Sequence, residues 1–480
     1  MGPLIHAAWL SVLLAGATPV TSPAPVAIPA EGEPDMTGTP PAPPREPERG
    51  TEQAHPGEKR DVPEYDGRAP ETPTAREGFI WIPRVLLFPA HVTAEYLVRR
   101  PVVGFLSWGE RHYVFKRVYD AVTWDDGHSG IYPLASLDIG IKSTVGLAMV
   151  DQHFLARLNS LRMATSASTQ GVFTVGAQDR LSVFRDGTGT LSLGANYTQR
   201  PDGVFYGIGP DTRNSDKTFY SFVSRGLALG LTGNLGGLHR ASIEIGYRDT
   251  TFGTSRVSAD VLSVDQRYGG PGQAPLPPGW DGYDLTWSRA TLVMDTRSPS
   301  FESSGTGVRL ATSAAYGISP RDPDLQLVSW GADAGGFYDL TGAHHVLALL
   351  LATHFTEKLG EREVPFTELP LLGGADWMRG FLGGRLRGAS TLAATLSYRY
   401  PVGNFLDGEL FSSVGNAFPG HLDEFAVQRL FLNWGFGLRT TFARDASFFL
   451  TLAFASNRFD DSNFNPVDAT RFSIGVIHGF

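Results

Sequence analysis

Residues 371–388, with the sequence LLGGADWMRGFLGGRLRG, bring glycine and arginine together at high density. They contain six glycines and three arginines, and their apolar residues follow neither a helical nor a strand period. A buried arginine needs a carboxylate or carbonyl acceptor, because removing an unpaired charge from water is costly. We therefore expect this loop to place its arginines either in bulk water or in the water-filled lumen of a wide barrel.

No other group of residues indicates catalysis or metal binding. The chain has no cysteine, which excludes disulfides, thiolate nucleophiles and thiolate metal ligands. His344 and His345 begin a predicted strand without a carboxylate at ligand spacing, and no Gly-x-Ser-x-Gly elbow occurs. We therefore expect no enzymatic activity, no cofactor and no metal. The net charge of −9 also argues against nucleic acid as a partner.

The residues after the glycine-rich loop predict a strand. Between residues 391 and 400, one face carries leucine, alanine and tyrosine, and the other carries threonine, serine, alanine and arginine. A period of two with one apolar face is typical of a half-buried strand. The same alternation continues from Pro133 to the end of the chain, most clearly at 432–439, 448–455 and 471–480. Lipid outside a closed barrel and water inside it would produce this pattern.

The number of strands is consistent with a closed barrel. We place eleven strands before the glycine-rich loop, including strands at 134–148 and 254–265, and five after it. Sixteen strands over residues 131–480 leave about 22 residues for each strand and connection, which suits transmembrane spans of ~10 residues. The predicted fold is all-β, a 16-stranded antiparallel transmembrane β-barrel with a short N-terminal helical segment. Residues 265–284 are expected to form a long extracellular loop.

A conventional membrane helix is not predicted. No stretch approaches 18 uncharged apolar residues, which is the minimum for a helix that crosses a bilayer. Strands of a transmembrane barrel escape such a search because only every second residue is apolar.

The N-terminal third is predicted to contain three different segments. Residues 1–17 resemble a signal peptide, with Ala15-Gly16-Ala17 as a cleavage site, although a short disordered N-terminus is the alternative. Residues 18–76 are rich in proline and predict a disordered linker. Residues 77–130 contain apolar residues at three- and four-residue spacing, which favours two or three amphipathic helices. These helices would lie at the barrel mouth or along the membrane interface, or would form an ordinary packed N-terminal segment.

Several motifs carry a resemblance to a known family. The similarity rests on Gly373-Gly374, Met378-Arg379-Gly380-Phe381 and Arg387-Gly388, followed by Tyr398-Arg399-Tyr400-Pro401. Further signatures occur in the expected order: Phe205-Tyr206-Gly207-Ile208-Gly209, Asp295-Thr296-Arg297 and Phe411-Ser412-Ser413-Val414-Gly415-Asn416. Residues 131–480 are thus similar to the bacterial surface antigen superfamily, which includes the BamA/TamA-type outer-membrane assembly barrels. The resemblance implies that the glycine-rich loop folds back into the barrel.

Departures from the family pattern raise the question of what pairs with Arg379. The family commonly has glutamate at the position of Ser397 and aspartate at that of Ser413, and the aspartate pairs with the loop arginine. Glu409 lies four residues before Ser413 on the same strand face, and Asp407 continues that row. We predict that one of these two carboxylates replaces the missing partner. A further departure is that the segment before residue 131 is not expected to hold the family's soluble polypeptide-transport-associated repeats.

We weigh two functions of different kinds. The first, which the resemblance implies, is insertion or translocation of client proteins at the outer membrane, and the alternative is a passive pore or structural barrel without insertase activity. Phe480, with Gly475 five residues before it, resembles a C-terminal assembly signal of outer-membrane barrels. The predicted partners are the lipid bilayer of the outer membrane and client outer-membrane proteins.

Overall fold

The structure is a computed structural model that describes most of the chain from residue 111 onward. The described ranges are 111–138, 143–156, 158–183, 188–297, 305–342, 344–403, 406–440 and 446–478, with residues 96, 104, 108 and 109. The predicted signal peptide, the proline-rich linker and Phe480 lie outside these residues.

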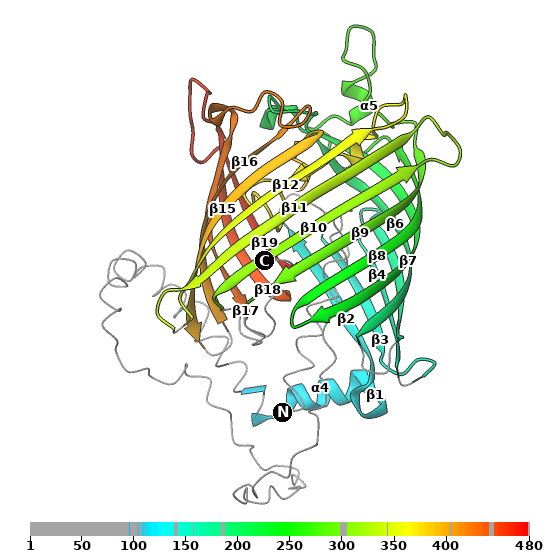
Figure 1. The fold of residues 1–480 in the computed structure, drawn as a ribbon, viewed down its shortest axis with the longest axis vertical. Helices are drawn as coiled ribbons and strands as arrows, with labels where there is room; N and C mark the ends of the chain where they lie inside the picture. Colours follow the sequence, from blue (N-terminus) through cyan, green and yellow to red (C-terminus); the bar gives the residue numbers. More distant parts are fainter. Residues whose placement is uncertain are drawn as a thin grey trace, which may run out of the picture.

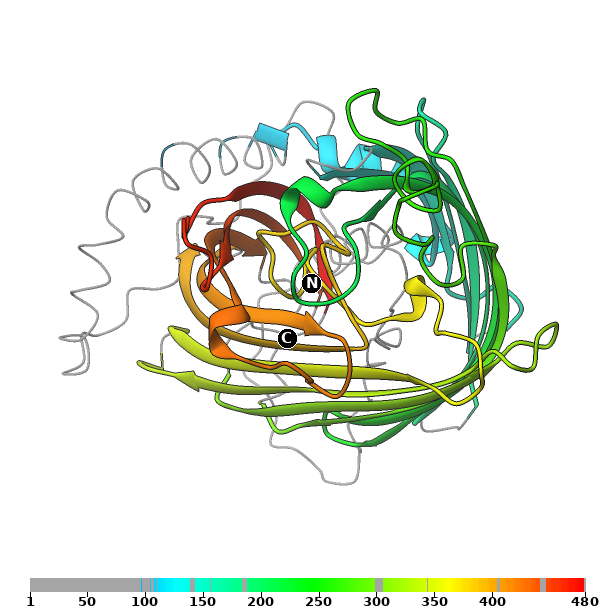
Figure 2. The same ribbon diagram turned by 90° about the horizontal axis from the view of Figure 1, so that it is seen from above.

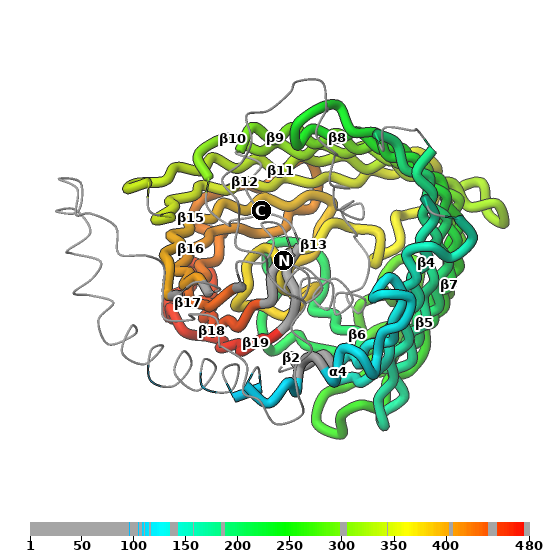
Figure 3. The backbone as a smooth tube through the Cα atoms, turned by 90° about the horizontal axis from the view of Figure 1, so that it is seen from below, coloured from blue at the N-terminus to red at the C-terminus, as the bar shows by residue number. Residues whose placement is uncertain are grey.

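Sixteen antiparallel strands form a ring in the described residues. Each strand pairs with its neighbours along the chain, and the last strand pairs with the first (Figures 1 and 3). Eleven of them precede the glycine-rich loop and five follow it, so the predicted fold class is confirmed. The strands are β2 (Ser129–Asp138), β3 (Thr144–Asp151), β4 (Asn159–Ala167), β5 (Phe173–Ser182), β6 (Gly189–Phe205), β7 (Thr218–Gly236), β8 (His239–Gly253), β9 (Tyr283–Asp295), β10 (Gly307–Ile318), β11 (Gln326–Asp339), β12 (Val346–Lys358), β15 (Ser390–Gly403), β16 (Leu406–Phe418), β17 (Phe431–Thr440), β18 (Ala446–Arg458) and β19 (Ala469–His478).

Two strand predictions were wrong, and the errors cancel in the count. The strand expected at 134–148 is two strands, because β2 ends at Asp138 and β3 begins at Thr144. The strand expected at 254–265 is part of the connection between β8 and β9. There the Ser263 hydroxyl accepts a hydrogen bond from the Ser255 backbone N–H at 3.0 Å, and such local bonds compete with a strand ladder. The long connection therefore covers residues 254–282 rather than 265–284.

The barrel is apolar outside and polar inside. Leu396 is 51% exposed and Ile243 is 62% exposed, whereas Arg399 and Arg439 are almost fully buried. A soluble protein shows the opposite distribution, because charged side chains are rarely buried without partners. Along β8, for example, the exposed Ile243 and Ile245 alternate with the inward-facing Ser242 and Glu244, as the sequence pattern predicted.

A short helical element leads into the barrel. Helix α4 (Val114–Val122) is followed by β1 (Thr123–Trp124), which pairs with the start of β2, and by the 3₁₀ turn η3 (Asp125–Gly127). Figure 1 shows α4 beside one end of the barrel. The opposite end carries the longest connections, including α5 (Val264–Arg267). None of the helices in the described part of the chain is long and apolar enough to cross a membrane.

Candidate functional site

The connection between β12 and β15, residues 359–389, folds into the barrel and is called the lumenal loop below (Figure 2). It contains the 3₁₀ turn η5 (Phe366–Glu368) and a small hairpin of β13 (Leu371–Leu372) and β14 (Leu386–Arg387). Gly373 has a φ of 106°, and a Cβ atom there would lie 2.2 Å from the carbonyl oxygen of Leu382. The glycines of this loop therefore allow a tight turn that other residues would obstruct.

Apolar side chains of the loop are buried against the inner wall. Met378, Phe381 and Leu386 are at most 2% exposed. Phe381 meets the ring of Phe431 edge to face, with centroids 5.5 Å apart. Burying an aromatic side chain of this size stabilises a structure by about 3 kcal/mol, so the loop is packed rather than suspended in lumenal water. The wall residues that receive it are mostly small and come from β15, β16, β17 and β18: Ala393, Ala417, Phe431 and Ala455.

Arg379 is paired with Glu409. Its Nη1 donates a hydrogen bond of 2.9 Å to Oε2 of Glu409, and both side chains are 7% exposed. Its guanidinium also lies 4.7 Å from the centre of the Phe411 ring. The second carboxylate oxygen of Glu409 accepts a hydrogen bond of 2.7 Å from the Ser397 hydroxyl and lies 3.9 Å from Nε of Arg399. Both oxygens of this carboxylate therefore have partners inside the barrel.

The other candidate, Asp407, is also buried on the inner face but occupies a different place in the sheet. It is 1% exposed, and its backbone is opposite that of Arg439 in the register of β16 and β17. The position that carries aspartate in the resembling family holds Ser413, which accepts a hydrogen bond of 2.9 Å from Thr395. Glu409, the acidic partner of Arg379, thus lies four residues before Ser413 along β16, which is about 13 Å at the rise of a strand.

Two further arginines attach the loop to the connection between β6 and β7, Arg385 through its side chain and Arg387 through its backbone carbonyl. Arg385 donates hydrogen bonds to the backbone oxygen of Thr212 at 2.8 Å and to Oδ1 of Asn214 at 2.9 Å, both in the β6–β7 connection. Burial lowers the pKa of Arg385 to about 10, so it remains charged at neutral pH. Arg387 donates to the backbone oxygen of Phe366, and its own carbonyl accepts a bond of 2.7 Å from Gly209.

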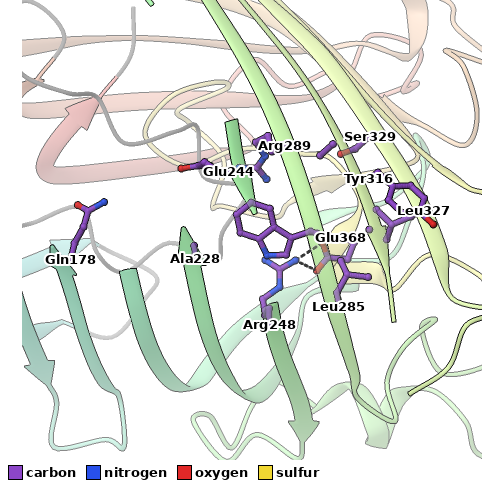
Figure 4. A pocket seen from close by; sticks show the side chains of 13 residues that line it. Gln178, Ala228, Glu244, Arg248, Leu285, Arg289, Tyr316, Leu327, Ser329 and Glu368 are labelled. Atoms are coloured by element: carbon purple, nitrogen blue, oxygen red, sulfur yellow. Dashed lines mark hydrogen bonds and ion pairs between the residues drawn. The ribbon is translucent and has the colours of Figure 1, made fainter. Parts of the chain in front are cut away.

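The first part of the lumenal loop is held by the opposite wall. Glu368 forms an ion pair of 2.5 Å with Arg248 of β8, and both residues line a pocket (Figure 4). Inward-facing side chains of β8 and β9 line this pocket, among them Glu244, Trp287 and Arg289. The loop is consequently anchored on two sides of the lumen, by Glu368 to β8 and by Arg379 to β16.

The ring of strands is joined unevenly. Among the described residues, β19 and β2 share two Cα pairs, Ser473 with Asp138 and Ile474 with Leu137. Residues 475–478 of β19 and 129–136 of β2 are also described but share no further pair, whereas β9 and β10 share ten. The pairing of β19 with β2 is called the seam below. Gly475, part of the predicted assembly signal, lies in β19 opposite Phe449 of β18.

Some contacts of the loop were not predicted from the sequence. Arg471 of β19 donates to the backbone oxygens of Gly374 at 2.5 Å and Arg379 at 3.1 Å. Asn433 accepts a hydrogen bond from the backbone N–H of Gly380. Both side chains belong to the polar faces of predicted strands, so their inward direction was foreseeable but their partners were not.

Comparison with known proteins identifies the family of this chain and solved structures with a similar fold. A model of the Omp85 superfamily domain matches residues 159–475. BamA from Haemophilus ducreyi lacking POTRA domains 1–3 has a TM-score of 0.54 and 13% identity, over 73% of this chain and 70% of that chain. CdiB from Acinetobacter baumannii has a TM-score of 0.45 and 13% identity, over 72% of this chain and 59% of that chain. No curated protein sequence matches. The similarity to BamA shows a shared barrel fold.

Proposed function

Because the chain belongs to the Omp85 superfamily, we propose that it inserts or translocates other proteins at the outer membrane, where it resides. A client protein would cross the barrel wall at the seam, or a client strand would pair there with the edge of β19 or β2. Of the described residues, 475–478 of β19 share no Cα pair with β2, and this observation supports the proposal most strongly. A weakly joined pair of edge strands can open and offer its free backbone groups to another strand.

The lumen itself favours this function over a passive pore. Anchors at Glu368 and Arg379 hold the lumenal loop across the barrel, and Phe381 packs against the wall. A loop bound on two sides obstructs the path that a solute would take. A wide solute path therefore requires the loop to move, whereas the Cα pairs of the seam involve neither anchor.

The proposal can be tested by locking the seam. The chain has no cysteine, so a pair introduced at Asp138 and Ser473 can form only one intramolecular disulfide. Facing residues of antiparallel strands have the Cα separation that a disulfide needs. The Asp138→Cys/Ser473→Cys protein should be reconstituted in liposomes, and insertion or translocation of unfolded outer-membrane proteins should be measured with and without reductant.

We expect the oxidised protein to lose most of its activity and to regain it after reduction. The matched control is Thr291→Cys/Ser313→Cys, which places an equivalent bond between the fully paired strands β9 and β10. This control should retain activity in both states. Full activity of the oxidised seam variant, or an equal loss in the control, would refute the proposal. Ion conductance without any client insertion would instead support the pore.

A further inference from the structure

Asp125, His128 and His153 converge at the end of the barrel that carries α4. We propose that they form a binding site for a divalent transition metal, with zinc as the expected ion. The site is remote from the lumenal loop, and the proposal does not depend on the proposed function. Sequence spacing did not reveal it, because His153 follows His128 by 25 residues and lies on another strand connection.

The three side chains already approach the geometry of a metal site. One ligand atom from each, a carboxylate oxygen or a ring nitrogen, lies within 4.8 Å of the other two. Nδ1 of His153 is 3.8 Å from Oδ2 of Asp125, and the two imidazole rings have centroids 4.5 Å apart. Tetrahedral zinc with bonds of about 2.0–2.1 Å requires ligand atoms about 3.3 Å apart. Rotation of the two stacked imidazole rings would therefore have to bring the three ligand atoms closer together.

Backbone hydrogen bonds hold the two contributing segments together. Asp125 and His128 lie on the tight turn between β1 and β2, where the backbone N–H of His128 bonds to the carbonyl of Asp125 at 2.9 Å. The carbonyl of His128 accepts a bond of 2.9 Å from the N–H of Gln152, at the end of β3. This contact places His153 beside His128. The backbone N–H of His153 donates a hydrogen bond of 2.9 Å to Oδ1 of Asp151.

The hydrogen bond of His128 leaves one of its ring nitrogens for a metal ion. Its Nδ1 lies 2.8 Å from the backbone oxygen of Asp125. A carbonyl oxygen can only accept, so Nδ1 donates this bond and Nε2 is the ring nitrogen left to bind a metal ion. Histidine ligands typically hold one ring nitrogen in a hydrogen bond to a carbonyl and offer the other to the metal.

The ligand types select the class of metal. Two imidazoles and one carboxylate suit zinc, nickel, cobalt or copper, whereas calcium and magnesium prefer sites made of oxygen atoms. His153 is 38% exposed and Asp125 is 59% exposed, so an ion from solution can reach the site and a water molecule can fill the fourth position. A bound ion would join the start of β2 to the end of β3.

Zinc binding by the full-length protein tests the proposal. Protein without a polyhistidine tag, in detergent and freed of metal with a chelator, should be titrated with zinc chloride by calorimetry. We expect one zinc ion per chain, with affinity at least tenfold lower in His128→Ala and in His153→Ala, and no detectable binding in the double variant. Magnesium should neither bind there nor compete. Bound zinc should also raise the unfolding temperature of the unsubstituted protein but not that of the double variant.

The control is His421→Ala, which removes another exposed histidine that is paired with a carboxylate, that of Glu357. This variant should bind zinc like the unsubstituted protein. Asp125→Asn provides a second test that leaves the turn backbone unchanged, and it too should weaken binding at least tenfold. The proposal is overturned if the unsubstituted protein binds no zinc at one-to-one stoichiometry, or if the double histidine variant binds it with undiminished affinity.

Discussion

Replacing Arg379 by alanine should release the lumenal loop from the barrel wall. The substitution removes a charge-assisted hydrogen bond of 2.9 Å to Glu409, worth about 1.5–3 kcal/mol, and a ring contact with Phe411, worth about 0.5–2 kcal/mol. Glu409 keeps the Ser397 hydroxyl and the nearby Arg399, which reduces the penalty for the carboxylate left behind. The net loss should be about 3 kcal/mol, or roughly a hundredfold in the equilibrium that docks the loop.

Hydrogen exchange of the loop amides measures this equilibrium. The backbone N–H of Gly380 is bonded to Asn433 and exchanges only when the loop opens, so its protection reports the docking free energy. We expect protection of residues 377–382 to fall roughly a hundredfold in Arg379→Ala. In Glu409→Gln it should fall about tenfold, because the amide still accepts one hydrogen bond but no longer balances the arginine charge.

A double substitution and a surface control make the measurement specific. If Arg379 and Glu409 act on each other, the double variant should lose less protection than the sum of the two single losses. Arg321→Ala is the control, since this arginine is 68% exposed and its ion pairs, with Asp249 and Asp284, involve no residue of the lumenal loop. A change of less than threefold in a folded Arg379→Ala protein would refute the reasoning. It would show that the guanidinium is equally stable in lumenal water.

Three further predictions concern other parts of the barrel. Gly380→Ala should displace the loop and raise its hydrogen exchange, because the added Cβ would lie 2.5 Å from Oδ1 of Asn433; exchange equal to that of the unsubstituted protein would contradict this. Glu368→Gln should weaken the ion pair with Arg248 and increase channel openings in planar bilayers, whereas an unchanged conductance trace would show that this anchor does not restrain the loop. Deleting Phe480 should reduce the amount of folded protein in the outer membrane, measured by its heat-dependent migration on gels, and normal assembly would refute its role as an assembly signal.

The candidate site illustrates which contacts can be predicted from a sequence. Alternation along residues 407–413 placed Glu409, Asp407 and Ser413 on one face of a strand, and so limited the acidic partners of Arg379 to two. The structure pairs Arg379 with Glu409. The choice between the two carboxylates depends on how far the loop reaches down the lumen, which packing of Phe381 and the surrounding wall decides.

The sequence by itself determined the barrel, because a strand period of two is a local property. Each strand has to present one face to lipid and the other to water, so its composition reveals both its existence and its orientation. Errors occurred where alternation continues from one strand to the next, as from β2 to β3, or into a connection, as at residues 254–265.

Only the tertiary structure decided which distant residues meet. The ion pair of Glu368 with Arg248, the short register of the seam and the grouping of Asp125 and His128 with His153 all join separate elements. Their positions follow from the stagger of the closed sheet and from the path of the loop across the lumen. Neither the stagger nor the path of the loop can be predicted from a local sequence pattern, because both are set by the packing of the whole ring.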